Sequence, residues 1–545
     1  MFGLKSVYFY LIACQITIIK FLKKLYFSSK SYNESLNTIT PKQINYNPNP
    51  FLLSIITTYK KHSFKISDIN PNIFWLEDKK KNSDQIHNFF WLNLIDRKTE
   101  HTIIKKVIYI WMLRNSKFKK RTWETSILCS RIISWILNID IILNNSTFEF
   151  KKNFLNCIIT QSNHLKKNLK FEKNSSKKIQ TLTAILLSGL IFKEYEDNFK
   201  IGIRELEAFV KNCFDKNGFP YSRNPNDLVF FSKYLILCKE IIKDSQKYVP
   251  EFLEDIINKN LNCIQFIKTP DGNMPLFNGA TFTNLNQIHQ FLENYKPKNQ
   301  KKKLGGLSRI KHKNHLVFMD VEEPPPKNFS NSYQSGPLAF EYFLDGVKII
   351  SNSGFGFDIS KKAEMLSKLT ACQSTLTIND TSVTKFERNK LINKVFGSSI
   401  KNTFKSYDIF NKNDDDIIGC SATNNGYEKR YGSTHKREIY IDKKNNYLKG
   451  IDHIYKKKDG YPLRYTFRFH INPELTAVKT MSGNGALIQL SKNKSLLFNI
   501  AEEELKVEKS LFFGDKKIID STCISISGNL VNKNKSFSWE IKKNI

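Results

Sequence analysis

The chain has 545 residues, more than a single hydrophobic core usually serves, so two large domains are expected. Apolar residues make up 40% of the sequence, which excludes a largely disordered chain, and 85 Lys and Arg against 51 Asp and Glu leave a formal charge of +34. That charge favours polyanions, but lysine is spread over the whole chain as a solvated coat. No basic run is interleaved with aromatic residues in the manner of a nucleic-acid-binding module, so a nucleic-acid partner is not indicated.

Residues 1–50 form an apolar and basic extension. The apolar run 7–19 is too short and too interrupted for a transmembrane span. Two interpretations remain open. One is a signal peptide, although no clear cleavage site follows the run. The other is a helix that lies on an anionic membrane surface through residues 5–27, with Lys20, Lys23 and Lys24 at the headgroups and Phe21, Leu22 and Leu25 in the lipid. We expect the cell envelope or periplasm as location, with the cytoplasmic face of the membrane as the alternative.

Residues 51–295 carry apolar side chains at helical spacing, for example Ile104, Ile108 and Trp111. Polar connectors rich in Asn and Lys separate the periodic stretches, which predicts an all-α domain. The nine cysteines are scattered singly, with no CxxC pair. We therefore expect reduced, mostly buried thiols, with neither a disulfide framework nor a metal finger.

The hydrophobic period changes at residues 296–306, a charged stretch with Pro and Gly that we interpret as a linker. In 307–545, short apolar runs of strand length alternate with turn residues. Asp345-Gly346 between two of these runs indicates a type I′ hairpin. The pattern predicts a large antiparallel β-sandwich, so the fold class expected for the whole chain is an α+β multidomain protein.

Specific strings in both halves follow the order found in one family. In the helical half, residues 218–225 read GFPYSRNP, and 123–135 form a segment bracketed by two tryptophans. The other strings are residues 271–279, 336–341, 374–382, 434–440 and 467–471. Together they resemble heparinase II/III-like polysaccharide lyases of the proteobacterial type, over about residues 70–545.

The resemblance implies a fold and a chemistry. The fold is an incomplete α/α toroid followed by the β-sandwich, with an acidic polysaccharide bound in the groove between them. The chemistry is β-elimination, the reaction of a carbon–oxygen lyase. A base removes the proton α to a uronate carboxylate, nearby donors neutralise that carboxylate, and an acid protonates the leaving glycosidic oxygen. No cofactor is expected.

The positions that the family uses for catalysis and metal binding are changed in this sequence. Alignment on the family strings puts Ser332 and Gln334 at two histidines, Asn352 at an aspartate and Gln373 at a third histidine. In the family the first of these acts in catalysis and the other three hold a metal. Amides are poor zinc ligands, so we expect no metal and, in its place, a hydrogen-bonded cluster of the three amides. The alternative is that they are unrelated surface or strand-end amides.

Residues in both halves remain as candidates for the chemistry and for glycan binding. The candidates for proton transfer are Tyr221 and His435. The candidates for substrate binding are Arg223, Asn224, Ser332 and Gln334. Arg223 stands out because a guanidinium binds a carboxylate through paired hydrogen bonds.

Three of these candidates have structural alternatives. Tyr221 could pack on the helix that begins near residue 225, and Arg223 could cap that helix or pair with Asp227. His435 could be a satisfied core histidine. Two functions from different classes therefore stay open: a lyase for acidic polysaccharides, and a catalytically degenerate glycan-binding or cell-envelope protein.

Overall fold

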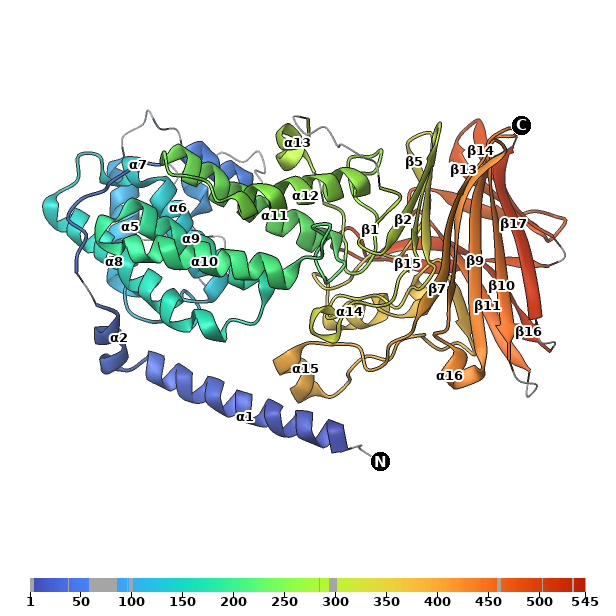
Figure 1. Cartoon of the computed structure of the whole chain (residues 1–545), viewed down its shortest axis with the longest axis horizontal. Coiled ribbons are helices and arrows are strands. Elements are labelled where there is room, and N and C mark those ends of the chain that lie inside the picture. The colour runs from blue at the N-terminus through green and yellow to red at the C-terminus, as the bar shows by residue number, and fades with distance from the viewer. Residues whose placement is uncertain are drawn as a thin grey trace. The chain divides into compact units, whose positions relative to one another are not determined.

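The computed structural model describes residues 4–37, 39–57, 86–95, 97, 101–283, 285–293, 301–457, 462–501, 503–531 and 534–544 (Figure 1). The chain forms two compact units. The helical unit comprises Met1–Phe214, Val229–Asn260 and Gln287–Phe291, and the sandwich unit comprises Asp215–Leu228, Leu261–Asn286 and Leu292–Ile545. Two segments that precede residue 296 therefore pack with the sandwich. The predicted linker, 296–306, lies partly outside the described residues, and strand structure begins at Lys303.

Helices dominate the described chain up to residue 293. The α-helices are α1 (Leu4–Phe27), α2 (Lys30–Leu36), α5 (Thr102–Asn115), α6 (Thr125–Leu137), α7 (Ile139–Leu143), α8 (Phe148–Asn168), α9 (Ser175–Ile191), α10 (Glu196–Cys213), α11 (Pro225–Asp244), α12 (Glu251–Ile267) and α13 (Asn286–Glu293). The short 3-10 helices are η1 (Pro50–Ile55), η4 (Phe90–Leu94), η5 (Leu169–Phe171) and η6 (Lys193–Tyr195). The predicted all-α character of this region is confirmed.

Helix α9 lies at the centre of the helical unit. All of its residues from Ile179 to Ile191 are buried, and it packs against α6, α8 and α10. Two glycines allow α9 and α10 to approach closely. A Cβ atom on Gly189 would lie 2.1 Å from the Phe199 nitrogen, and one on Gly202 would lie 2.9 Å from Leu186 Cβ. A larger residue at either position would force the two helices apart.

Strands dominate the described chain from residue 303 onward. They are β1 (Lys303–Leu304), β2 (Leu307–His312), β3 (His315–Asp320), β4 (Phe340–Leu344), β5 (Val347–Ser351), β6 (Leu376–Ile378), β7 (Ser406–Asn413), β8 (Ile417–Asn424), β9 (Ser433–Asp442), β10 (Tyr447–Lys456), β11 (Leu463–Ile471), β12 (Thr476–Lys479), β13 (Gly485–Ser491), β14 (Lys494–Ile500), β15 (Leu505–Phe512), β16 (Ile519–Leu530) and β17 (Asn534–Asn544). Between them lie η7 (Lys327–Phe329), α14 (Lys361–Ser367), η8 (Thr370–Cys372), α15 (Lys390–Phe396) and α16 (Glu428–Tyr431).

The described strands form two antiparallel sheets. One has nine strands in the order β1-β2-β3-β4-β5-β11-β16-β15, with β6 paired to β11, and the other has eight in the order β12-β13-β14-β17-β10-β9-β8-β7. Their inner faces share one hydrophobic core, in which the rings of Phe340 on β4 and Trp539 on β17 stack 5.4 Å apart. The predicted antiparallel sandwich is confirmed.

The hairpin predicted at Asp345-Gly346 joins β4 to β5. Leu344 pairs with Val347, so the loop has two residues. Asp345 and Gly346 both have positive φ, 51° and 85°, as a type I′ turn requires. The local sequence therefore sets the register of this strand pair.

The cysteines are all free thiols, and seven of the nine are buried. The expectation that these side chains are mostly buried is confirmed. Among the described helices, none combines the length and the apolar character that a membrane crossing requires.

Candidate active site

A tight turn before α11 holds the candidates from the helical half of the sequence. Asp215 Oδ1 accepts hydrogen bonds from the backbone nitrogens of Asn217 and Phe219, at 2.8 and 2.9 Å, and so closes the turn. Farther along, Asn224 Oδ1 accepts from the Asn226 nitrogen at 2.9 Å. Asn224 therefore caps the helix, and the proline that follows it suits the first helical position. The whole turn belongs to the sandwich unit.

Arg223 is sealed inside the sandwich unit. It is 7% exposed, its Nε donates to the Gly305 carbonyl at 3.1 Å, and its two terminal nitrogens donate to the Glu323 carbonyl and to the Asp320 carboxylate. Burial alone would lower the pKa of Arg223, but the Asp320 carboxylate outweighs it and the pKa is raised. The ionic partner is thus Asp320 and not Asp227, the partner considered from the sequence.

Three loops of the sandwich unit, 221–228, 275–283 and 330–335, meet at Gly279. The Gly279 nitrogen donates to Gln334 Oε1 at 3.0 Å, and Asn224 Nδ2 donates to Ser332 Oγ at 3.3 Å. Gly279 has φ 100°, and a Cβ there would lie 2.5 Å from Ser332 Cβ and 2.8 Å from Asn224 Nδ2. Three of the four predicted binding residues therefore come together around a position that only glycine fits.

A buried carboxylate fixes one of these loops to the sheet. Glu341 on β4 accepts hydrogen bonds from the backbone nitrogens of Leu276 and Asn352, at 3.1 and 3.0 Å. Its charge is balanced by Lys348 Nζ at 3.0 Å, and both side chains are almost fully buried. The 275–283 loop is thereby bound to strand β4 of the nine-stranded sheet.

Of the three amides expected to form one cluster, Gln334 and Gln373 share a backbone acceptor, whereas Asn352 has a separate backbone partner. Gln334 Nε2 donates to the carbonyls of Gly354 and Ser367, both at 2.9 Å, and Gln373 Nε2 donates to the same Ser367 carbonyl at 3.0 Å. Asn352 Oδ1 accepts from the Ser374 nitrogen at 2.9 Å. All three residues are buried. They are interior amides rather than surface groups, and Asn352 directly follows the last residue of β5.

This donor set does not fit zinc or calcium. The amide oxygens of Gln334 and Asn352 already accept backbone N–H groups, and the buried Nδ2 of Asn352, which has no partner among the described residues, is a donor that cannot ligate a cation. No group of three or more His, Cys, Asp or Glu side chains in the described ranges is placed to hold a metal ion. The chemistry proposed for these residues therefore assigns no step to a metal ion.

Elemental analysis tests the metal prediction. We expect protein purified without chelator to contain far less than one equivalent of zinc or calcium, because amides bind these ions poorly. The matched comparison is the triple variant Gln334→His, Asn352→Asp and Gln373→His, which restores the donor set of the family and is expected to gain zinc. One equivalent in the unmodified chain would overturn the prediction.

His435 lies inside the sandwich, between its two sheets. It is 2% exposed, and its Nε2 donates to Asp452 Oδ1 at 2.7 Å. Asp452 also accepts from Arg437 Nε at 2.7 Å and Nη2 at 3.1 Å, and from Trp539 Nε1 at 2.9 Å. Burial lowers the pKa of His435, although Asp452 opposes this effect. Its predicted role in proton transfer stays untested, but its contacts are those of a satisfied core histidine.

Tyr221, in the turn before α11, and Asp227, in the first turn of that helix, are titratable side chains that retain exposed surface. Tyr221 is 36% exposed, and its ring lies 5.7 Å from that of Phe329. Asp227 is partly exposed and accepts a hydrogen bond from Ser222 Oγ at 2.6 Å. Burial raises the pKa of Asp227 to about 6, although that hydrogen bond opposes the rise. A carboxyl group with such a pKa exchanges protons near neutral pH.

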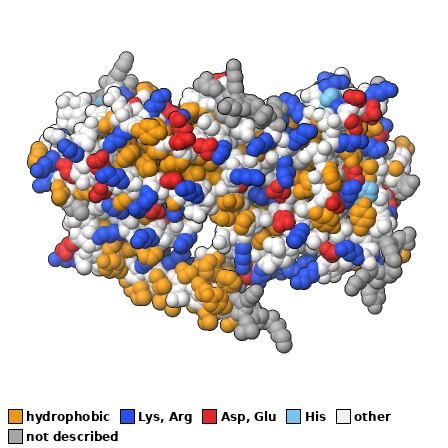
Figure 2. All heavy atoms as spheres, in the orientation of Figure 1, with side chains coloured by type: hydrophobic (Ala, Val, Ile, Leu, Met, Phe, Trp, Pro, Cys, Tyr) orange, Lys and Arg blue, Asp and Glu red, His pale blue; other side chains and the backbone are white. Residues whose placement is uncertain are grey.

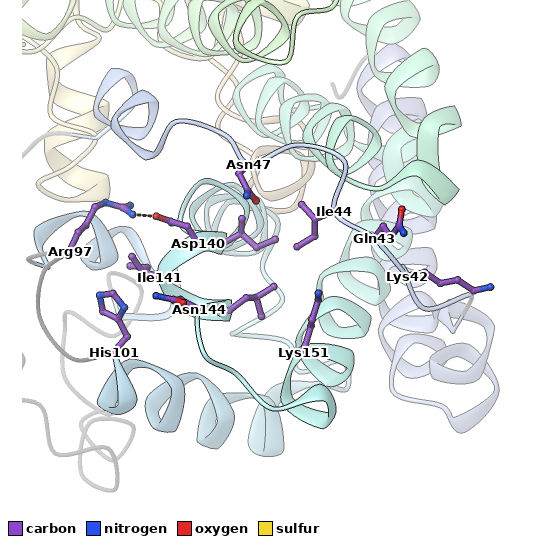
Figure 3. Close-up of a pocket in the computed structure, with 12 residues that line it drawn as sticks. Lys42, Gln43, Ile44, Asn47, Arg97, His101, Asp140, Ile141, Asn144 and Lys151 are labelled. Atoms are coloured by element: carbon purple, nitrogen blue, oxygen red, sulfur yellow. Dashed lines mark hydrogen bonds and ion pairs between the residues drawn. The ribbon is translucent and has the colours of Figure 1, made fainter.

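The helical unit contains a separate hollow of about 670 Å³ (Figure 3). Arg97 donates to Asp140 across one side of it at 2.6 Å, and His101 and Lys151 are among the side chains that line it. None of the candidates from the sequence lies there. The hollow therefore offers no independent support for the site at Gly279.

The C-terminal half of the chain is similar to a known family of domains. The family model described as Heparinase II/III-like, C-terminal, matches residues 297–540. This half carries a heparinase II/III-like C-terminal domain. A comparison of the sequence with curated proteins gives no match. The amide cluster and the Arg437–Asp452 pair both lie in this heparinase II/III-like domain.

Solved structures resemble the chain well beyond that domain. A mutant of the heparan sulfate lyase from Pedobacter heparinus is 15% identical, with 94% of this chain and 87% of that chain covered and a TM-score of 0.64. A heparinase III gene product is 14% identical, with 93% and 87% covered and a TM-score of 0.67. Another heparinase III structure is 12% identical, with the same coverage and a TM-score of 0.67. At these identities the likeness establishes the fold, an incomplete α/α toroid followed by a β-sandwich.

Several residues of the site were not singled out from the sequence. Asp320 is a charged residue at the end of the apolar run of β3, a pattern that could have marked it as a buried ion-pair partner. Phe329 follows a proline-rich loop with no recognisable signal, and Glu341 belongs to a family string without an assigned role. Asp452 lies in the alternating pattern of β10, where its complete burial cannot be read from the sequence.

Proposed function

We propose that this chain is a protein of the polysaccharide lyase type that binds a uronate-containing acidic polysaccharide at Tyr221, Phe329 and Ser332, here called the Tyr221 surface. The observation that carries the proposal is the convergence of three loops at Gly279, next to an exposed tyrosine that packs on a second aromatic ring. Rigid aromatic side chains offer contact area to the apolar face of a sugar ring at a low entropic cost. The heparan sulfate lyase and heparinase III that share the fold support an acidic glycan as ligand.

The proposed chemistry is β-elimination with Tyr221 in contact with the glycan. The phenol lies at the surface, where its oxygen can reach a sugar, whereas His435 is enclosed in the sandwich core. Asp227, six residues farther along in the first turn of α11, supplies a carboxylate that ionises near pH 6 and can take part in the proton transfers. Both groups belong to the segment whose geometry the Asn224 cap defines.

Elimination also requires donors that neutralise the uronate carboxylate. Arg223 is committed to Asp320 and to two backbone carbonyls. The side chains that meet at Gly279, those of Asn224, Ser332 and Gln334, carry neutral hydroxyl and amide donors, which stabilise developing charge less than a guanidinium does. We therefore expect slow elimination relative to glycan binding. The same observation favours the second candidate function, a glycan-binding protein without catalysis.

The first test combines product formation with binding. The purified chain is mixed with heparan sulfate and with other uronate glycans, and unsaturated uronate is followed by its ultraviolet absorbance while binding is measured by calorimetry. Product with at least one glycan supports the lyase, and binding without product supports the glycan-binding protein. If no uronate glycan binds and none is cleaved, both proposals fail.

Variants at Tyr221 test the assigned residue. If the phenol transfers a proton, Tyr221→Phe is expected to lower kcat by about 100-fold or more while leaving affinity nearly unchanged, and Tyr221→Ala is expected to weaken binding as well. The control is Tyr248→Phe in the helical unit, where the ring is 82% exposed and far less change is expected. A kcat that is unaffected by Tyr221→Phe would remove this residue from the chemistry.

The pH profile tests Asp227 independently of Tyr221. Because the pKa of Asp227 is about 6, a role as base predicts a rate that rises as pH increases through 6. Asp227→Asn should abolish that rise. An unchanged profile in the variant would assign the titration to another group.

A further inference from the structure

Helix α1 is attached to the helical unit mainly at its C-terminal end. The ring of Phe27 packs 4.7 Å from Tyr32, 5.2 Å from Phe118 and 5.2 Å from His164, and the Lys23 ammonium lies 2.9 Å from the centre of the Phe171 ring. Among the α1 side chains whose burial is described, Ala13 alone is buried. Most of the other α1 side chains whose burial is described are exposed, and the remainder are partly buried, although the helix is rich in apolar residues.

Five of the exposed apolar residues of α1 form one continuous stripe. They are spaced by three, four or seven residues, so they share one helix face, on which exposed Gln15 fills the widest gap. The stripe consists of Tyr8 (63% exposed), Leu11 (61%), Ile18 (59%), Leu22 (57%) and Leu25 (56%). Figure 2 shows apolar side chains gathered along α1. A continuous exposed apolar surface of this kind marks an interaction site.

The charge around this stripe has a single sign. Residues 1–33 contain five lysines and no Asp or Glu. Lys20 and Lys24 are exposed and, at about 100° per residue, lie nearly opposite Leu22 on the helix. Their long stems can carry the ammonium groups to the level of lipid headgroups while the stripe enters the acyl region.

We propose that α1 docks the protein on an anionic lipid surface, with the stripe of Tyr8, Leu11, Ile18, Leu22 and Leu25 inserted and the lysines at the phosphate headgroups. A second copy of α1 suits this surface less well, because two such helices bring lysines together without a carboxylate to pair with them. The exposed apolar face of α1 is also wider than the contact face of a two-helix coiled coil. Val7, Tyr10 and Phe21 beside the stripe are 47%, 44% and 60% exposed.

Vesicle sedimentation of the full chain tests the proposal. The probes are vesicles of phosphatidylcholine alone and of phosphatidylcholine with phosphatidylglycerol. We expect binding to the anionic vesicles, weakened by added salt, and far less binding to the neutral ones. Leu11→Glu with Leu22→Glu should reduce binding by about tenfold or more, since a charge on the inserted face opposes burial in lipid. Lys20→Glu with Lys24→Glu should abolish the preference for anionic lipid.

Two controls keep the test specific. Phe148→Glu with Tyr248→Glu changes two apolar side chains that are each 82% exposed in the same unit but outside α1, and binding should stay unchanged. Leu22→Trp keeps the stripe apolar and adds a fluorescent probe, whose emission should shift to the blue on anionic vesicles and be quenched by brominated lipid. This conservative variant reads out insertion even where the double glutamate variant fails to fold.

Three results would overturn the proposal. One is the absence of binding to both kinds of vesicle. The second is equal binding to neutral and anionic vesicles, which would remove the role of the lysines. The third is a dimer in analytical ultracentrifugation that is lost in the Leu11→Glu, Leu22→Glu variant while Leu22→Trp shows no insertion, which would assign the stripe to a second copy of this chain.

Discussion

Replacing Arg223 by alanine is expected to lower the free energy of unfolding by about 3–5 kcal/mol, the usual cost of removing one partner from a buried ion pair. The change would leave the Asp320 carboxylate, which is 1% exposed, without its guanidinium. It would also remove the donors to the carbonyls of Gly305 and Glu323, which tie the turn before α11 to the strands of the sandwich unit. Urea denaturation of both proteins measures the difference.

Two further variants test whether the loss of stability comes from the buried ion pair. Arg204→Ala removes an arginine that is 72% exposed in its ion pair with Glu205, and a loss of no more than about 1 kcal/mol is expected. Arg223→Met combined with Asp320→Leu removes both charges and should recover much of the lost stability. If Arg223→Ala leaves stability intact but weakens glycan binding, the arginine is a ligand-binding group and the structural assignment is wrong.

The sequence was most informative where a local rule controls the structure. The helical spacing of apolar residues over 51–295 predicts an all-α region, and the described helices of that region include α9, which is buried from Ile179 to Ile191. Asp345-Gly346 predicts a two-residue hairpin, and both residues have the positive φ that the turn requires. In each case the deciding interactions lie within a few residues, so periodicity and turn chemistry suffice.

The site was less predictable because its contacts join distant parts of the chain. Arg223 and Asp320 are separated by 97 residues, so the nearer Asp227 was considered as the ionic partner and the guanidinium was expected to be open to a ligand. Asn224, Ser332 and Gln334 were chosen by family resemblance, and they do assemble around Gly279. Whether a polar side chain serves the fold or a ligand depends on its tertiary partners, which a single sequence does not reveal.

Asp452→Asn is expected to destabilise the sandwich unit by about 3–5 kcal/mol at neutral pH, because it leaves Arg437 buried without a counter-ion. Asp452 lies opposite Arg437 in the β9–β10 register and joins it to His435 and Trp539. Arg437 Nη1 also donates to the carbonyls of Leu338 and Ser374, at 2.8 and 2.7 Å, which links β9 to the segments that precede β4 and β6 of the other sheet. The variant therefore weakens an inter-sheet connection as well as an ion pair.

The pH dependence of this effect has a definite sign. Burial alone would raise the pKa of Asp452, but Arg437 and His435 outweigh it and hold the pKa well below its usual range. A carboxyl group whose pKa is lower in the folded state contributes stability above its unfolded pKa of about 3.9 and loses that contribution as pH falls toward its folded pKa. The difference in stability between Asp452→Asn and the unmodified protein should therefore be largest near neutral pH and shrink below about pH 4.

Fluorine NMR of fluorotryptophan-labelled protein can follow this unit separately, since Trp539 is the only tryptophan beyond residue 135 and its indole donates to Asp452. In Asp452→Asn the Trp539 signal should move and should melt earlier than the five tryptophan signals from residues 75–135. The matched control is Asp515→Asn, where a carboxylate that is 52% exposed pairs with Lys517 at 3.5 Å and little change is expected. Equal stability of Asp452→Asn and Asp515→Asn would mean that the buried charge of Arg437 finds another partner, and the network would then not be the connection that holds the two sheets together.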